Sequence, residues 1–172
     1  MFSAPLMKAT TEPVDAQCLL FCNLISAPSL KADTKPNDVR CLTDNIYFEA
    51  RNQSTAGQLA VDAVTFNRVS SKRFPNSICE VVFQGLTYKD TGRPLKNKCQ
   101  FSWYCDGKPD NIKNLGVYFK ISHLSKMLVG SISERLDITD GATHYHHHSI
   151  NPAWSKSMTE TVRIDEHVFY RN

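Results

Sequence analysis

Residues 39–70 read VRCLTDNIYFEARNQSTAGQLAVDAVTFNRVS, and this stretch has the pattern of two successive amphipathic helices. Apolar residues recur every three or four positions on both sides of the polar break RNQS, which is the period of helices with one buried face. The spacing predicts one helix over residues 39–50 and a second that starts at a cap formed by Ser54 or Thr55 and ends near Ser70. The apolar stripe of the first helix consists of Leu42, Ile46 and Ala50.

Downstream of this helix pair, the period of the sequence changes. Ser77 and Glu80 have the spacing of a capping box that opens a third helix, and a helical stripe predicts a fourth over residues 112–132. Residues 85–110 are rich in glycine and proline and predict a loop. Short strands are predicted at Ala142–His147, Glu160–Ile164 and His167–Tyr170. Helices followed by a small antiparallel sheet give an α+β domain.

Upstream of the helix pair, residues 1–37 are predicted to form an appendage to a catalytic domain of residues 38–172. Asp15 caps a predicted short helix that ends at Ile25, and the stretch up to Asp38 is rich in Pro, Ser and charge, which indicates a linker. The N-terminus is polar and acidic where a secretory signal has its apolar core. No stretch approaches the ~20 apolar residues that cross a bilayer, so we expect no membrane span.

The charge and the cysteines narrow the class of protein. The formal net charge is +3, and the basic residues are scattered, whereas nucleic-acid binding needs a clustered basic face. We therefore expect no nucleic-acid partner. Cys99 and Cys105 close a short loop and could form a disulfide, whereas Cys18 and Cys22 fall on one helix face, where free buried thiols are expected. The sequence leaves the redox state of the cysteines open.

Glu49 is the first candidate for chemistry. It stands near the end of an apolar helix, beside Tyr47 and Phe48. Loss of water around a carboxyl group raises its pKa toward a value that suits an acid catalyst at neutral pH. The alternative is a helix-end glutamate paired with Arg51 or a nearby lysine.

A run of histidines, His144-Tyr145-His146-His147-His148, is the second candidate. Alternate residues of a strand face one way, so the three even-numbered imidazoles could converge, and three imidazoles suit zinc. Packing and hydrogen bonds to sugars form the alternative, which we favour because no Asp or Glu stands at a familiar ligand spacing. We therefore expect no metal and no organic cofactor.

The third candidate is the segment Cys99-Gln-Phe-Ser-Trp-Tyr-Cys105. Aromatic rings stack on sugar faces while amide and hydroxyl groups bind sugar hydroxyls, so this composition suits a carbohydrate site. A small core under a loop is the alternative. Arg68 reads as a basic residue against the dipole of a helix C-terminus, and Trp154 reads as a core residue.

Together these segments resemble the SleB-type cell-wall hydrolase family, which includes the catalytic domain of spore cortex-lytic enzymes and their proteobacterial and phage relatives. The resemblance covers about Cys41 to Arg171. It is carried by IYFEAR (46–51), AGQLAV (56–61), VTFNRV (64–69), RFPNSIC (73–79), CQFSW (99–103), DGATHY (140–145), and RI to HVFYR (163–171). The family usually has Gly-Glu where this chain has Asn52-Gln53, and often has Gly where it has Asp165-Glu166. We expect Asn52 to adopt the left-handed turn that Gly permits.

The resemblance implies a lysozyme-like α+β fold related to lytic transglycosylases, with Glu49 as the catalytic acid. We expect a monomer that cleaves the bond between N-acetylmuramic acid and N-acetylglucosamine in peptidoglycan strands and leaves 1,6-anhydromuramyl ends. The expected substrate contacts are Gln100, Phe101, Ser102, Trp103, His144, Tyr145 and His146. The expected setting is the bacterial cell wall, with a phage endolysin made in the host cytoplasm and released without an evident signal peptide.

Three other functions stay open on the sequence. A hydrolytic muramidase needs a second carboxylate, for which Asp62 and Glu80 are available, although Asp62 fits a polar helix face. A zinc amidase or peptidase would use the histidine run. A non-catalytic wall-binding module would use Phe101 and Trp103 as its platform.

Overall fold

The computed structural model describes residues 36–131 and 135–172. The expected helix over residues 15–25, with Cys18 and Cys22, lies outside the described residues. The first described helix, α1 (Pro36–Ala50), starts three residues before the expected position, within the stretch predicted as a linker. Proline is tolerated in the first turn of a helix because its missing N–H is not needed there.

The second helix, α2 (Thr55–Ser70), has the predicted bounds. Ser54 is its N-cap, and the Ser54 hydroxyl accepts a hydrogen bond from the Gly57 backbone N–H at 3.2 Å. The cap is itself held from outside, because Asp165 Oδ2 accepts hydrogen bonds from the Ser54 backbone N–H and hydroxyl at 2.9 and 2.7 Å. A Cβ atom at Gly57 would meet this carboxylate, so the close approach requires glycine.

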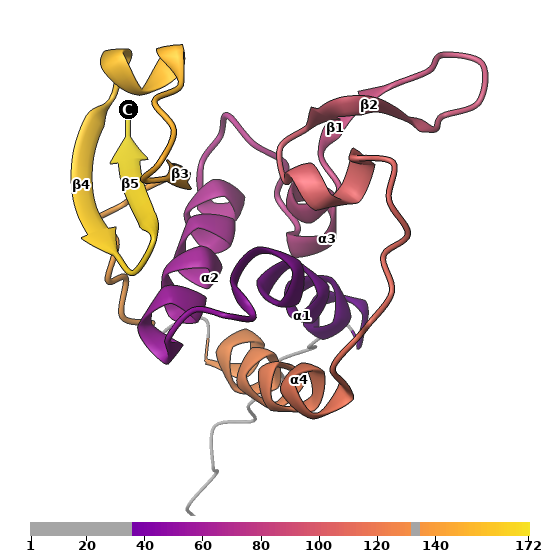
Figure 1. Cartoon of the computed structure of the whole chain (residues 1–172), viewed down its shortest axis with the longest axis horizontal. Helices are drawn as coiled ribbons and strands as arrows, with labels where there is room; N and C mark the ends of the chain where they lie inside the picture. Colours follow the sequence, from indigo (N-terminus) through magenta and orange to yellow (C-terminus); the bar gives the residue numbers. More distant parts are fainter. Residues whose placement is uncertain (1–35, 132–134) are drawn as a thin grey trace, which may run out of the picture. The chain divides into compact units, whose positions relative to one another are not determined.

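Two further helices complete the helical part. Helix α3 (Ile78–Val82) is capped by Ser77, as the capping box predicts. Helix α4 (Leu115–Gly130) is capped by Asn114 and begins three residues after the predicted start at residue 112. In Figure 1, α1 lies between α3 and α4 and beside α2. Their apolar faces form one core, to which α1 contributes the predicted stripe and the buried ring of Tyr47.

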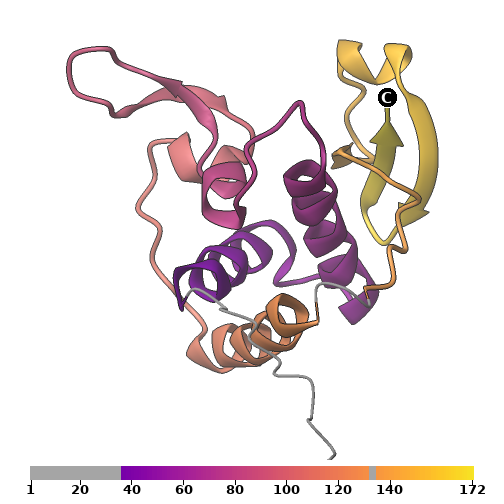
Figure 2. The same ribbon diagram turned by 180° about the vertical axis from the view of Figure 1, so that it is seen from behind.

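A small antiparallel sheet with strand order β3-β5-β4 follows the helices, which confirms the α+β class. Its strands are β3 (His144–His147), β4 (Thr159–Ile164) and β5 (His167–Arg171). Figures 1 and 2 both show this sheet beside α2, on the side away from α1. A second apolar cluster of Ala60, Val64, Ala142 and Phe169 joins α2 to the sheet.

Residues 85–110 are more regular than the predicted loop. They contain a hairpin of β1 (Gly85–Thr87) and β2 (Pro94–Cys99) and a short 3-10 helix, η2 (Ser102–Cys105). A second 3-10 helix, η4 (Ala153–Ser157), stands between β3 and β4. The hairpin escaped the sequence analysis because its strands are short and largely exposed and so lack an alternating apolar pattern.

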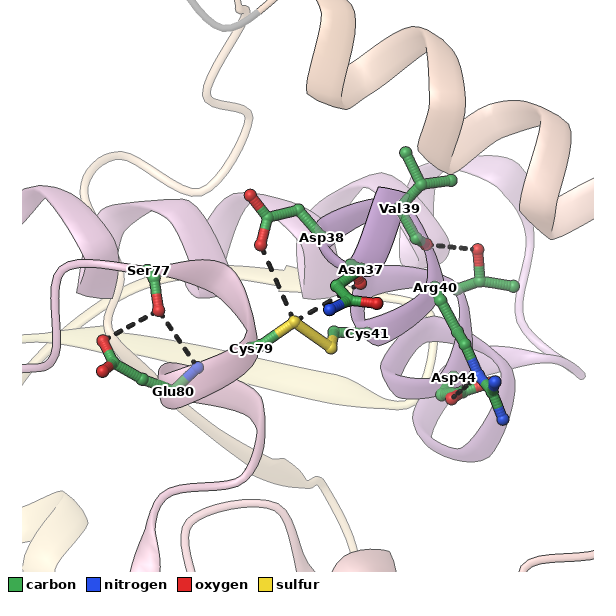
Figure 3. The surroundings of a disulfide bond; sticks show 10 residues. Asn37, Asp38, Val39, Arg40, Cys41, Asp44, Ser77, Cys79 and Glu80 are labelled. Atoms are coloured by element: carbon green, nitrogen blue, oxygen red, sulfur yellow. Dashed lines mark hydrogen bonds and ion pairs between the residues drawn. A yellow bond between two sulfur atoms is a disulfide. The ribbon is translucent and has the colours of Figure 1, made fainter. Parts of the chain in front are cut away.

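Two disulfides fix these elements. Cys99–Cys105 is the bridge that the sequence allowed, and it closes the turn between β2 and η2. Cys41–Cys79, which the sequence analysis did not predict, ties the first turns of α1 to α3 (Figure 3). In the part of the chain that is described, no helix has the length and apolar character needed to cross a membrane.

Candidate active site

Glu49 lies in the last turn of α1, and its side chain reaches a tyrosine of the C-terminal sheet. The Tyr145 hydroxyl on β3 donates a hydrogen bond to Glu49 Oε2 at 2.9 Å. The alternative pairing with Arg51 is not formed, because the Arg51 guanidinium instead donates to the carbonyl oxygens of Tyr47 and Phe48 at the end of the helix. Helix α1 thus delivers a carboxyl group to a tyrosine that follows 96 residues later in the chain.

The surroundings of Glu49 favour its protonated form. Burial raises the pKa of the Glu49 carboxyl group, and this effect outweighs the opposing influence of the Tyr145 hydrogen bond and of the Arg68 charge. Burial and the nearby Glu49 charge raise the pKa of Tyr145 well above its ordinary value, so its hydroxyl keeps the proton that it donates. Glu49 is therefore a carboxylic acid that accepts a hydrogen bond from the neutral hydroxyl of Tyr145.

A cavity of about 350 Å³ opens beside this pair. Its walls come from α1, α2, the segment after β2, β3 and the residues around η4, so it lies where the helices meet the sheet. The lining residues are Glu49, Arg68, Gln100, Ser102, Tyr145, His146, His147, Ile150, Pro152, Trp154 and His167.

Four of the expected substrate contacts line this cavity, namely Gln100, Ser102, Tyr145 and His146. Gln100 and Ser102 are exposed at its rim, whereas His146 is buried and its Nε2 lies 3.1 Å from the Tyr170 hydroxyl. These four residues, which were predicted to contact the substrate, thus lie around the same cavity as Glu49.

The other three expected contacts do not line this cavity. Phe101 is buried, with its ring under the guanidinium of Arg68 at 4.9 Å. Trp103 stacks on Phe48, donates its indole N–H to Asn45 and lines a separate cavity of about 300 Å³. His144 lies between the rings of Phe74 and Trp154, where burial lowers its pKa to about 4.

The histidine run is divided among separate contacts. His144 and His146 both contact Trp154, at 5.5 and 5.6 Å between ring centroids, and His147 stacks on His148. Within residues 36–131 and 135–172, no three side chains of His, Cys, Asp or Glu are grouped as metal ligands would be. The three even-numbered imidazoles, which could have converged on one strand face, are therefore not grouped among the described residues.

The two candidates for a second carboxylate lie elsewhere. Asp62 was expected on a polar helix face, but its side chain is buried and pairs with Arg135 at 2.9 Å beside a different, mostly apolar cavity. Glu80 is exposed at the start of α3 and binds the Ser77 hydroxyl. Among the described residues that line the cavity, Glu49 is the one carboxylate.

Sequence reasoning missed several residues of the cavity. Arg68 was read as a helix-end residue and Trp154 as core, yet both line it, as does His167. The register of the sheet offered a signal for His167, because it pairs directly with His147 on β3. No local pattern marks Arg68, whose position depends on the sheet packing against α2.

Comparisons with known proteins identify the family of this chain. The Cell Wall Hydrolase family matches residues 52–170, which begin three residues after Glu49. The spore cortex-lytic enzyme of Halalkalibacterium halodurans is 27% identical over 125 residues, covering 72% of this chain and 32% of that protein. That of Bacillus subtilis is 27% identical over 129 residues, covering 74% and 35%. The chain thus spans about a third of the length of these curated relatives.

Solved structures bear out the fold. The catalytic domain of Bacillus cereus SleB is 24% identical, with a TM-score of 0.55 over 78% of this chain and 90% of that one. The catalytic domain of the germination-specific lytic transglycosylase SleB from Bacillus anthracis is 23% identical, with a TM-score of 0.53 over 79% and 95%. Since the family match covers more than half of the chain, this protein belongs to the SleB-type cell-wall hydrolase family.

Proposed function

We propose that this protein is a lytic transglycosylase that cuts peptidoglycan between N-acetylmuramic acid and N-acetylglucosamine, with Glu49 as its catalytic acid. The observation that carries the proposal is the single carboxylate among the described residues that line the cavity. A hydrolase of the lysozyme type needs a second carboxyl group ~5–10 Å from the acid, to hold a water or to attack the sugar. A transglycosylase needs only one, because the substrate supplies the nucleophile.

In the first step, Glu49 gives its proton to the glycosidic oxygen as the bond from that oxygen to C1 of the muramyl sugar breaks. The raised pKa of Glu49 keeps the proton available near neutral pH. The carboxylate that forms keeps the hydrogen bond from Tyr145 and lies within the field of the Arg68 charge. These two groups stabilise the charge that develops on the acid.

In the second step, the Glu49 carboxylate takes the proton of the muramyl C6 hydroxyl while O6 bonds to C1. The product is a 1,6-anhydro ring, and Glu49 regains the proton that it gave, so the cycle closes without water. The C6 hydroxyl is already tethered near C1, which avoids the entropy of recruiting a second molecule. Gln100 and Ser102 at the rim would bind the hydroxyls of the sugar rings, and Trp154 would stack on a sugar face. The phage setting stays a prediction.

Mass spectrometry of digested peptidoglycan tests the proposal. We expect muramyl ends that are lighter by one water than the hydrolytic product. A digest dominated by reducing muramic acid would instead indicate a muramidase, and freed stem peptides would indicate an amidase.

The same assay with Glu49→Gln tests the role of the acid. This change keeps the shape of the side chain and removes the proton, so we expect a loss of at least ~100-fold. Glu80→Gln is the matched control, because it also removes a carboxylate but lies outside the cavity. A folded Glu49→Gln protein with near-normal turnover would exclude Glu49 as the acid.

A further inference from the structure

Arg68 is a buried charge without a counter-ion. Its side chain enters the cavity from α2, and the residue is 4% exposed. No carboxylate of the described residues lies within 4.0 Å of its guanidinium, although Glu49 is close enough for its charge to act on it. A buried ion that lacks a partner costs free energy, unless a ligand supplies the partner.

The orientation of this guanidinium is fixed. Arg68 Nε donates a hydrogen bond to the Thr143 carbonyl oxygen at 2.7 Å. The rings of Phe74 and Phe101 lie 5.3 and 4.9 Å from the guanidinium carbon. The fork is therefore held at one angle before any substrate binds, which is the preorganisation that a specific contact requires.

The two terminal nitrogens of the Arg68 guanidinium donate no hydrogen bond within the described residues. Nη1 is buried and has no hydrogen-bond partner, and Nη2 makes no hydrogen bond to any described residue. Buried donors are almost always paired in folded proteins, and an unpaired one calls for an explanation. The cavity that holds Glu49 is the space next to this fork.

We infer that Arg68 binds an amide carbonyl oxygen of the glycan beside the bond that is cut. This inference rests on the proposed function and names a contact within that site. A guanidinium fork favours oxygen atoms with high electron density, and the amide carbonyls are the strongest neutral acceptors on a peptidoglycan strand. They have two sources, the N-acetyl groups at C2 of the sugars and the lactyl group that joins muramic acid to the stem peptide.

Paired changes in enzyme and substrate test the contact. The enzymes are the wild type, Arg68→Met and, as a control for loss of charge, Arg40→Met on the exposed face of α1. The first three substrates are intact strands, strands whose N-acetyl groups have been removed, and the same strands after re-acetylation. The fourth is made by removing the stem peptides with an amidase and then reducing the exposed lactyl carboxyl groups to alcohols, with the unreduced peptide-free strands as its reference. The readout is kcat/KM for each pair.

We expect the wild type and Arg40→Met to lose about 10- to 100-fold on whichever strand lacks the recognised carbonyl, as befits a hydrogen bond to a charged donor. Arg68→Met should lose less than ~3-fold on that strand, because its contact is already gone. Coupling to the N-acetyl change assigns that source, coupling to the lactyl change assigns the other, and re-acetylation must restore the wild-type rate.

Equal losses for wild type and Arg68→Met on both altered strands would overturn the inference, as would a wild type that cuts all strands equally well. Such results would leave Arg68 as a structural residue or as a charge that acts on Glu49 alone. If Arg68→Met does not fold, Arg68→Lys carries the same test, because it keeps the charge and loses the fork. These outcomes are separate from those of the proposed function, which fails if Glu49→Gln is active or the anhydro ends are missing.

Discussion

At the scale of single residues, the site depends on a carboxyl group placed where water is scarce. The helical stripe and the aromatic neighbours of Glu49 were visible in the sequence, and so was the strand that carries Tyr145. The partnership of the two residues was not visible, because it needs the end of α1 to meet β3 across 96 residues. Arg68 and His167 were missed for the same reason, since each becomes part of the site through tertiary contacts alone.

Tyr145→Phe should show what the hydrogen bond from Tyr145 contributes to catalysis by Glu49, because it removes that bond and leaves the carboxyl group in place. The Tyr145 hydroxyl lowers the pKa of Glu49 and holds its orientation, so its loss should reduce kcat by about tenfold or more. The high-pH limb of the activity profile, where the acid loses its proton, should move to higher pH. Tyr118→Phe is the matched control, because it removes a tyrosine–carboxylate hydrogen bond to Asp44 outside the cavity. An unmoved limb in Tyr145→Phe would contradict the arrangement.

Glu49→Gln should also change stability, in a direction that depends on pH. The pKa of Glu49 is raised in the folded protein above its ordinary value of 4.5, so folding favours the protonated form. The stability that this contributes is present below pH 4.5 and is lost as the pH rises through the raised pKa. We therefore expect Glu49→Gln to have a higher free energy of unfolding than the wild type at neutral pH and no such gain at pH 4.

Urea unfolding at the two pH values measures this difference. Glu80→Gln again serves as the control, since Glu80 is exposed and should give no gain at neutral pH. A Glu49→Gln protein that is less stable than the wild type at neutral pH would mean that the carboxylate is well solvated or well paired, contrary to its burial.

At the scale of elements, the helices were predictable and the hairpin was not. Helix α2 followed its sequence pattern to both ends because its cap and its apolar stripe agree. The start of helix α1 was predicted too late, because a proline fits the first turn of a helix as well as it fits a linker. The hairpin of β1 and β2 has no buried face, so its sequence lacks the alternation of apolar and polar residues that marks a strand. The spacing of Cys99 and Cys105 was the one sign of regular structure in this segment.

The two departures from the family pattern touch each other. Gln53 Nε2 donates to Glu166 Oε2 at 3.0 Å, and the neighbouring Asp165 carboxylate accepts from the Ser54 N–H and hydroxyl. Asp165 has a φ of 50°, the left-handed conformation that glycine often supplies, whereas Asn52 does not have the positive φ that we expected. The turn between β4 and β5 thus uses its own side chains to dock on the start of α2.

The two disulfides should differ in what they contribute to stability. Cys41–Cys79 closes a separation of 38 residues and Cys99–Cys105 one of 6 (Figure 3 shows the former). Loop-closure entropy predicts losses of about 4 kcal/mol and about 2 kcal/mol when the bridges are removed. We expect the Cys41→Ala, Cys79→Ala protein to unfold at a clearly lower urea concentration than the Cys99→Ala, Cys105→Ala protein.

Unfolding of the wild type after reduction gives the matched control for the disulfides, because it removes both bridges without changing the side-chain carbon atoms. If the longer bridge contributed no more than the shorter one, the strain or the residual structure of the unfolded chain would outweigh loop closure.

At the scale of the whole molecule, the candidate site and the core that supports it are found among the described residues. Each described residue that lines the cavity falls between Glu49 and His167, and the described core begins with residues of α1. The predicted appendage of residues 1–37 lies almost entirely outside the described residues, so its status as an appendage stays a prediction. Its predicted boundary, however, falls inside α1, which begins at Pro36.

Deletion of residues 1–35 should therefore leave the cleavage of isolated peptidoglycan within about threefold of the full chain. The cut precedes α1 and spares the Cys41–Cys79 bridge, the core and the cavity. Deletion of residues 1–43 is the matched control, because it removes Cys41 and the buried Leu42 with half of α1. Loss of such core residues costs about 2–5 kcal/mol each, enough to unfold a domain of ordinary stability. Circular dichroism and the release of anhydromuramyl products distinguish the cases. A folded protein that lacks residues 1–35 and cannot cut isolated peptidoglycan would show that those residues complete the site. The catalytic domain would then include residues N-terminal to α1.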